Sequence, residues 1–496
     1  MNTPNHLTQL VAALAFAGDI SMGQPTEHSP RVTLIALQLA QAIGLSKDDQ
    51  IRLARLALLR WAGCTANAHA MADFLGDDIH GRAEWVAGRS PFIDTEPPNE
   101  PLSQHIAPLA HSHCEAMTEI SQRAGIDFGE RLVPGDLSSL PKSIADLFEY
   151  WDGSGSPSGR QGDAIDPLAQ ITAIASDIEA FSRHYGIEQA LTLIDARSGK
   201  HYNPAFAQTA ITHAEQWLDQ LTNTDVLTKA LACAELSSER VTLSVEEIAI
   251  LLSDYAALKH PDSMRLSRLA SAMAEQTAKH LGFSKKESAL IKRATLLHRL
   301  GFVSVSNKKL QGYTDNESDR LAPYWTQRIL KQAPVLEKEA ELASMSYECL
   351  DGSGYYRGLT ASHLSTAARI VQVAVAAATL RVAENQPKQR TSWQSELTTL
   401  GESGQLDIKI SDALIASQNG TPQTLSFQTA ISPTTLTKRE KDVMGLVTQG
   451  LSNKEIARTL KIAPKTVSAH LENIYRKLMV TGRTAATMKA LEYGFL

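Results

Sequence analysis

Two stretches of this chain repeat each other, without a gap, 238 residues apart. Residues 28–63 align with residues 266–301, and both contain a Gly-x-Ser-Lys turn between two apolar segments. Further along, an Asp-Gly-Ser-Gly loop at 152–155 recurs at 351–354, so the first copy holds about 39 extra residues, expected near 76–104. A repeat of this length indicates two duplicated domains rather than a solenoid.

Each copy is expected to be a helical bundle. Val32, Ile35 and Leu39 recur at the spacing of one helix face, and the same pattern continues in the following segment. Aromatic residues make up only 6% of the chain and strand-like runs are few, so the predicted fold class is all-α. A length of 496 residues suits about three domains. The predicted division is residues 1–235 for the first copy, 236–417 for the second, 418–435 for a linker and 436–496 for a C-terminal domain.

Charge is distributed unevenly along the chain. The whole chain has a net charge of −6, yet residues 436–496 contain 11 Lys and Arg against 5 Asp and Glu. The remainder is therefore clearly acidic. A small basic module on an acidic body is typical of a nucleic-acid-binding domain attached to another function, although a solvated basic helix face would show the same imbalance.

The second Asp-Gly loop belongs to a longer motif. Residues 348–359 read Glu-x-x-Asp-Gly-Ser-Gly-Tyr-Tyr-Arg-Gly-Leu, and this segment resembles the signature of HD-GYP domains. That resemblance implies helical, metal-dependent phosphohydrolases, of which the best-known members cleave cyclic di-GMP. In such enzymes, His and Asp ligands hold two or three metal ions that activate a water molecule.

Most ligand positions implied by this resemblance carry other residues here. In the second copy only His298 remains, and in the first only His28 and His113. The replacements in the second copy are Leu266, Arg299, Phe302, Ala322, Ser346, Tyr347 and Val375; those in the first are Arg60, Trp61, Leu147, Phe148 and Ser176, with Asp177 one position out of register. We therefore expect two degenerate HD-GYP-like domains with no metal site, no catalytic residue, no cofactor and no enzymatic activity.

The remaining motif residues then have structural interpretations. Asp152 and Asp351 are expected to shape tight loops with their glycines, and the three histidines to be hydrogen-bonded core residues. Arg60 and Arg299 would each place a guanidinium where a metal ion would lie. Two alternatives follow: binding of a nucleotide or other anionic effector, or pairing of each arginine with a neighbouring carboxylate.

The C-terminal module shows the start and stop signals of four helices. Thr437 with Glu440, and Ser452 with Glu455, form two capping boxes, and Pro464 suits the first turn of a third helix. The third helix has an apolar stripe, and Lys and small polar residues on its opposite face. This pattern predicts a helix-turn-helix whose recognition helix enters the major groove. The stripe is Val467, Leu471, Ile474 and Leu478, and a fourth helix is expected over 483–493.

Residues 436–496 closely resemble the LuxR-type DNA-binding domain. The resemblance rests on Leu-Thr-x-Arg-Glu at 436–440, Gly-x-Ser-Asn-Lys-Glu-Ile-Ala at 450–457 and Pro-Lys-Thr-Val-x-x-His at 464–470. It implies contacts of Thr466 and His470 with the DNA backbone, and a homodimer paired through the last helix. The full set of predicted DNA-binding residues is Lys454, Lys465, Thr466, Ser468, Ala469, His470, Glu472, Arg476 and Lys477.

Together these features predict a transcription regulator that binds double-stranded DNA through the C-terminal domain. Its catalytically inactive body would sense a ligand or contact proteins. A phosphohydrolase with residual activity and a protein-interaction adaptor remain the alternatives. The longest uncharged apolar stretch, near 370–380, is too short to span a membrane, and the four cysteines form no CxxC pair, so we expect a cytoplasmic protein with reduced thiols.

Overall fold

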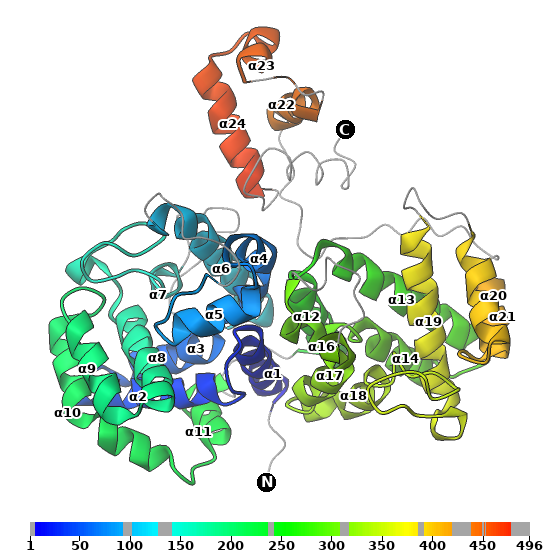
Figure 1. Cartoon of the computed structure of the whole chain (residues 1–496), viewed down its shortest axis with the longest axis horizontal. Coiled ribbons are helices and arrows are strands. Elements are labelled where there is room, and N and C mark those ends of the chain that lie inside the picture. The colour runs from blue at the N-terminus through cyan, green and yellow to red at the C-terminus, as the bar shows by residue number, and fades with distance from the viewer. Residues whose placement is uncertain are drawn as a thin grey trace. The chain divides into compact units, whose positions relative to one another are not determined.

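The computed structural model describes two compact units of the chain. The described residues are 5–92, 102–126, 141–236, 243–307, 317–384, 391–418, 438–448, 451 and 453–477. They form helices and short 3₁₀ turns and contain no β-strand beyond isolated bridges (Figure 1). The predicted all-α fold class is thereby confirmed.

The first copy begins the body. Its main layer is formed by α2, α3 and α8, which pack on one another, while α9 packs against α8, and α10 and α11 pack against α2. Its elements are α1 (His6–Ser21), α2 (His28–Ala42), α3 (Lys47–Leu59), η1 (Cys64–Asn67), α4 (Ala68–Leu75), α5 (Asp78–Val86), α6 (Leu102–Ala124), α7 (Lys142–Ala145), η3 (Gly162–Ala164), α8 (Pro167–Tyr185), α9 (Ile187–Arg197), α10 (Pro204–Leu221) and α11 (Val226–Cys233).

The second copy repeats this arrangement around α13, α14 and α19. The helices α4 and α5 of the first copy have no counterpart among the described residues of the second. Helix α5 lies within the stretch near 76–104 in which extra residues were expected, and α4 directly precedes it. The elements are α12 (Val245–Ala257), α13 (Pro261–His280), α14 (Lys285–Leu296), η5 (Leu300–Ser304), α16 (Glu317–Arg320), α17 (Ala322–Leu330), η6 (Pro334–Leu336), α18 (Glu337–Ala343), η7 (Ala361–His363), α19 (Thr366–Ala383), α20 (Trp393–Glu402) and α21 (Ile408–Gln418).

The repeated Gly-x-Ser-Lys sequence forms the same turn in both copies. Gly44 and Gly282 have φ angles of 77° and 82°, a left-handed conformation that costs least for glycine. Two residues later, Ser46 and Ser284 cap the next helix by accepting a hydrogen bond from its third backbone N–H. The repeat in sequence is therefore a repeat of helix-turn-helix geometry.

The two copies share one apolar core. Helix α1 packs against α12, η5 and α17, and α12 in turn packs against η1 and α6. Fully buried side chains of both copies, among them Leu10, Ile35, Tyr255 and Leu300, belong to a single continuous cluster. The body thus behaves as one compact unit, because neither copy could expose its share of this cluster to water without a large cost.

Helix α19 is the one described helix that is long and apolar enough to cross a membrane, with a mean hydropathy of 1.3. Half of its residues are buried inside the protein, where it packs against α13 and α14. A buried core helix can have the same length and composition, so these two properties do not distinguish a core helix from a membrane span. The cysteines Cys64, Cys114, Cys233 and Cys349 are free, and the first two are buried.

The second unit contains α22 (Lys438–Thr448), α23 (Asn453–Leu460) and α24 (Pro464–Lys477). Its small core is made by Val443, Met444, Val447, Ile456, Ala457, Val467, Leu471 and Ile474. Three of the four residues of the predicted apolar stripe are thus buried as expected, and Pro464 is the first residue of α24. Thr437, Gly450, Ser452, Leu478 and the predicted fourth helix lie outside the described residues.

Candidate functional site

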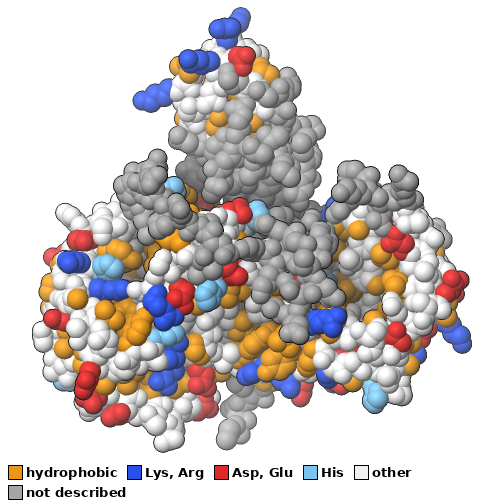
Figure 2. All heavy atoms as spheres, viewed as in Figure 1, with side chains coloured by type: hydrophobic (Ala, Val, Ile, Leu, Met, Phe, Trp, Pro, Cys, Tyr) orange, Lys and Arg blue, Asp and Glu red, His pale blue; other side chains and the backbone are white. Residues whose placement is uncertain are grey.

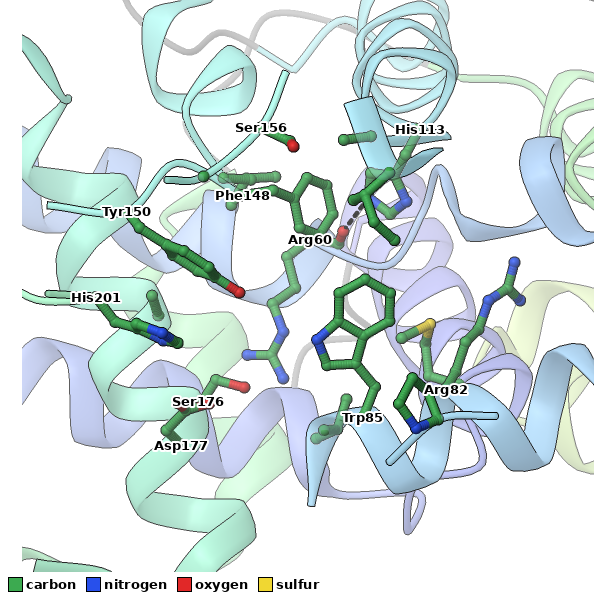
Figure 3. A pocket seen from close by; sticks show the side chains of 18 of the residues that line it. Arg60, Arg82, Trp85, His113, Phe148, Tyr150, Ser156, Ser176, Asp177 and His201 are labelled. Carbon is green, nitrogen blue, oxygen red and sulfur yellow. Dashed lines mark hydrogen bonds between the residues drawn. The ribbon is translucent and has the colours of Figure 1, made fainter. Parts of the chain in front are cut away.

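The body contains a cavity of about 520 Å³ in the first copy (Figure 3). Helices α4, α5, α6 and α8 and the loop around Tyr150 surround it. Seven aromatic or imidazole side chains, His113 among them, contribute to its walls, and four arginines line it, with Asp177 as the one acidic residue among the lining residues. The other rings are Trp61, Trp85, Phe148, Tyr150, His201 and Tyr202, and the arginines are Arg60, Arg82, Arg89 and Arg197.

A buried chain of hydrogen bonds runs from α8 to the cavity. The Nδ1 atom of His28 donates to a carboxylate oxygen of Glu179, and its Nε2 atom accepts a hydrogen bond from the Nη2 atom of Arg60. Burial lowers the pKa of His28 to about 4, which keeps the imidazole neutral at pH 7. Burial alone would raise the pKa of Glu179, but His28 and Arg183 outweigh it and lower this pKa to about 2. Glu179 is therefore the anion of the group.

Arg60 is almost completely buried, with 2% of its surface exposed. Its Nη2 atom has the neutral His28 as a partner, whereas its Nε and Nη1 atoms have no hydrogen-bond partner in the described structure. Burial lowers the pKa of Arg60 to about 10, so the guanidinium remains charged at neutral pH. Of the two sequence-based interpretations, pairing with an adjacent carboxylate is not what the described residues show.

The other three arginines of the cavity have partners of their own. The Nη1 atom of Arg197 lies 2.7 Å from Asp177, and Tyr202 donates to the same carboxylate oxygen. Arg89 makes two hydrogen bonds of 2.5 and 2.6 Å with Glu84. The Nη2 atom of Arg82 donates to the carbonyl of Cys64 at 2.8 Å. Arg60 is therefore the cation of this set with unused hydrogen-bonding capacity.

The described residues do not fit a divalent metal ion at this position. The imidazole Nε2 atom of His28, which would be available to a metal, already accepts from a cation. The Nε2 atom of His113 lies 2.6 Å from the backbone carbonyl of Arg60 and donates to it, while burial lowers the pKa of His113 to about 4. Among the residues that the structure describes, no group of three or more His, Cys, Asp or Glu residues could hold a metal.

In the second copy, aromatic rings surround Arg299, which aligns with Trp61 of the first copy. The Nε atom of Arg299 donates to the hydroxyl of Ser263 at 3.1 Å, and its guanidinium lies 4.5 Å above the ring of Phe302. Tyr347 stacks on Tyr355 with a centroid distance of 5.3 Å. Arg60 also lies over an aromatic ring, 4.6 Å from the centroid of Trp61, but it lines the cavity and its Nε and Nη1 atoms have no hydrogen-bond partner in the described structure.

Both Asp-Gly loops have the structural role predicted for them. The Oδ1 atoms of Asp152 and Asp351 each accept hydrogen bonds from the backbone N–H and the hydroxyl of the serine two residues later. Gly153 and Gly352 between them have φ angles of 82° and 83°. The preceding glutamate of each motif, Glu149 or Glu348, accepts two backbone N–H bonds and closes the loop.

His298 is a hydrogen-bonded core residue, as predicted, and this gives a pH-dependent stability. Its Nδ1 atom lies 2.7 Å from the carbonyl of Thr295, and burial lowers its pKa to about 3. Because an unfolded histidine titrates near 6.5, the unfolded chain binds an extra proton between these values. We expect the stability advantage of wild type over His298→Gln to be complete above pH 6.5 and to shrink as pH falls towards 3. Urea unfolding at several pH values measures this, and a constant difference would contradict it.

The C-terminal unit presents the predicted DNA-binding residues on α23 and α24. Lys454, Lys465, Thr466 and Ala469 are exposed, and Ser468 and His470 are partly exposed. Figure 2 shows Lys and Arg side chains projecting from this unit. The side chains of Glu472, Arg476 and Lys477 lie outside those that the structure describes.

Packing explains why that face of α24 is free. Val467, Leu471 and Ile474 are buried against α22 and α23, so the opposite face of the helix points outwards. The Nδ2 atom of Asn453 reaches the hydroxyl of Ser468 at 3.4 Å and joins the two helices of the motif. An exposed helix face with small side chains is what a recognition helix needs to approach base edges.

Fold and motifs together define the class of this chain: a helical HD domain body joined to a helix-turn-helix DNA-binding domain. Residues 104–206 and 250–406, more than half of the chain, match the HD domain family, and the chain belongs to that family. Residues 434–490 match the bacterial regulatory proteins of the luxR family. Both resemblances seen in the sequence are confirmed.

Different relatives match the body and the C-terminal domain. The body is similar to the 3′3′-cGAMP-specific phosphodiesterase 3 of Vibrio cholerae, with 26% identity over 74% of this chain and 85% of the relative. The C-terminal domain is 51% identical to the nitrate/nitrite response regulator protein NarP of Escherichia coli, over 12% of this chain and 26% of the regulator. A crystal structure of a cyclic GMP-AMP-specific phosphodiesterase of V. cholerae shares the fold, with a TM-score of 0.59 and 21% identity over 84% of this chain and 99% of that one.

These relationships correct one prediction from the sequence. We expected no enzymatic activity because most ligand positions implied by the HD-GYP resemblance carry other residues. That expectation is contradicted by the HD domain match and by the phosphodiesterase relative, which point to phosphohydrolase activity. The prediction failed because it weighed isolated positions along one motif, whereas the similarity extends over most of the body.

Several residues of the cavity were not identified from the sequence. Trp85 and Arg82 of α5 and Tyr150 of the loop before α8 line the cavity, and Glu179 of α8 lies behind it, bonded to His28. A weak signal existed for Glu179, since it lies one helical turn beyond Ser176 on the same face of α8. The others are brought together only by the fold.

Proposed function

We propose that this protein is a ligand-responsive transcription regulator that binds double-stranded DNA as a homodimer in the cytoplasm. The observation that carries the proposal is a LuxR-type domain with an outward-facing recognition helix in the same chain as an HD body. The body supplies a cationic cavity with aromatic walls, which suits a small nucleotide-type effector. An effector can change DNA binding only if it has different affinities for two states of the protein.

A genome-wide pull-down of DNA bound by the intact protein in its own cell tests the regulator proposal. Discrete peaks that share a short inverted repeat are the expected result, because two subunits related by twofold symmetry read two half-sites. The double variant Lys465→Ala/His470→Ala should lose these peaks. Diffuse binding without a shared motif, or a regulatory phenotype that survives in the double variant, would contradict the proposal and favour the adaptor alternative.

Phosphodiester hydrolysis is a second candidate function of the body. It is favoured by the similarity to the 3′3′-cGAMP-specific phosphodiesterase 3 over 85% of that relative. Incubation of the purified full-length protein with 3′3′-cGAMP and Mn²⁺, followed by chromatography of the nucleotides, tests it directly. A linear dinucleotide or mononucleotide product supports hydrolysis. If the dinucleotide remains unchanged when the enzyme is present in excess, hydrolysis of 3′3′-cGAMP is rejected.

A further inference from the structure

The cavity of the first copy contains a cation that is not fully satisfied. Arg60 is 2% exposed, and two of its three guanidinium nitrogens have no hydrogen-bond partner in the described structure. A buried charged donor left without partners is costly, so native proteins rarely retain one without a reason. The guanidinium is held in place from the other side by His28, which is itself fixed by Glu179.

The surroundings of Arg60 favour an anion. Of the charged groups near it, Glu179 is already engaged by Arg183 and Arg31, at 3.2 and 3.6 Å. Burial raises the pKa of Asp19 to about 7, so this neighbour is partly protonated at neutral pH. The cavity beside Arg60 is thus left with an excess of positive charge, which attracts an anionic ligand.

The walls of the cavity suit a ligand that also carries an aromatic ring. In Figure 3 the Arg60 side chain extends between Tyr150, Ser176 and Trp85, all of which line the cavity. Tyr150 is stacked on His201 with a centroid distance of 4.0 Å, which gives one rigid planar wall. A phosphate bound to the guanidinium would therefore lie beside surfaces on which a nucleobase can stack.

We infer that this cavity binds a nucleotide whose phosphate is held by the Arg60 guanidinium, at a position where the HD-GYP resemblance implies a metal ion. Binding would require no metal, because the arginine supplies the positive charge and a planar pair of donors. The inference deepens the proposed function, since it rests on the proposal that the body binds an effector. It assigns no such role to the second copy, where Arg299 is engaged by Ser263 and Phe302.

Isothermal titration of the full-length protein in EDTA tests this inference. The probes are 3′3′-cGAMP, GMP and inorganic phosphate, and quenching of tryptophan fluorescence gives a second readout because Trp61 and Trp85 line the cavity. We expect binding of at least one nucleotide in EDTA, at least tenfold tighter than that of inorganic phosphate. Equal affinity for all three probes would show a simple anion site and overturn the nucleotide assignment. Absence of binding by every probe would overturn the inference as a whole.

Two variants and a matched control test the role of Arg60. Arg60→Met should weaken nucleotide binding by at least tenfold, and Arg60→Lys, which keeps the charge but loses the planar fork, should give an intermediate loss. Arg299→Met makes the same change in the second copy, at the arginine directly after the residue that aligns with Arg60, and should leave the affinity unchanged. Unaltered binding by both Arg60 variants, or wild-type binding that appears only when Mn²⁺ is added, would overturn the inference. Arg60→Lys and the EDTA result remain informative if Arg60→Met does not fold.

Measuring DNA affinity together with nucleotide binding separates this inference from the proposed function. Nucleotide binding that depends on Arg60 but leaves DNA affinity unchanged would support the cavity assignment and contradict the effector proposal. DNA binding at discrete sites without binding of any nucleotide probe would support the proposed DNA-binding regulator and contradict the cavity assignment.

Discussion

Replacing Lys259 by methionine is expected to lower the free energy of unfolding by about 3–5 kcal/mol, the usual cost of leaving one partner of a buried ion pair alone. The Nζ atom of Lys259 lies 2.7 Å from Asp78, and the two side chains are 2% and 0% exposed. Asp78 lies in α5 of the first copy and Lys259 precedes α13 of the second, so the pair joins the copies inside their shared core. Urea unfolding monitored by circular dichroism measures the change.

The neighbours of this pair explain why its ionised state persists. Burial alone would raise the pKa of Asp78, but Lys259 and Arg82 outweigh it and lower this pKa. The other carboxylate oxygen accepts the backbone N–H of Asn307 at 2.7 Å. Without Lys259, the carboxylate would keep only the more distant Arg82, at 3.7 Å, as a charged partner.

The pair Lys279 and Glu275 provides a matched control. These residues form an ion pair of 2.6 Å, but the lysine side chain is 57% exposed. Lys279→Met should therefore cost less than about 1 kcal/mol, because exposed pairs contribute little. If the two methionine variants lost the same stability, the buried pair would not have the role assigned to it. The double variant Lys259→Met/Asp78→Leu should recover part of the loss, since it removes both charges.

Replacing Ala469 by glutamate is expected to weaken specific DNA binding by about 100-fold, a loss of the size of one good base contact. Ala469 is exposed on the outer face of α24, and its side chain does not contribute to the small core of the domain. A glutamate there would place a carboxylate against the edges of the bases and the nearby phosphates. Electrophoretic mobility shifts with a site found in the pull-down measure the affinity.

The control for this variant is Thr459→Glu on α23. Thr459 is also exposed, and the substitution changes the charge of the domain by the same amount. We expect a loss of about threefold or less, due only to long-range repulsion from DNA. A similar loss in both variants would mean that the charge of the domain, and not the outer face of α24, governs binding.

The DNA-binding domain could be predicted well because its signals are local. Pro464 begins α24, and Val467, Leu471 and Ile474 form its buried stripe, as the periodicity of the sequence indicates. The luxR-family match, over residues 434–490, includes all of these residues. Short helices with capping residues and one apolar face leave little for distant contacts to change.

The body was predicted less completely because its site is assembled from distant segments. The duplication and the Asp-Gly loops could be recognised from the sequence, and the structure confirms the hydrogen bonds of Asp152 and Asp351 within their loops. Motif positions also pointed to Arg60. They could not show that its partner would be the neutral His28, with Glu179 behind it, because these residues lie 32 and 119 positions away along the chain.

The sequence by itself determined the helical class, the duplication and the DNA-binding module, since each depends on a period or motif that is contained in a short segment. Only the tertiary structure decided what the two former motif positions became. Arg60 aligns with His298, and Arg299 with Trp61. The structure places Arg60 at a cavity with two guanidinium nitrogens unpartnered among the described residues, whereas Ser263 and Phe302 engage Arg299. The physical reason is that hydrogen-bonding capacity and burial depend on all the elements packed around a side chain, which a local repeat does not specify.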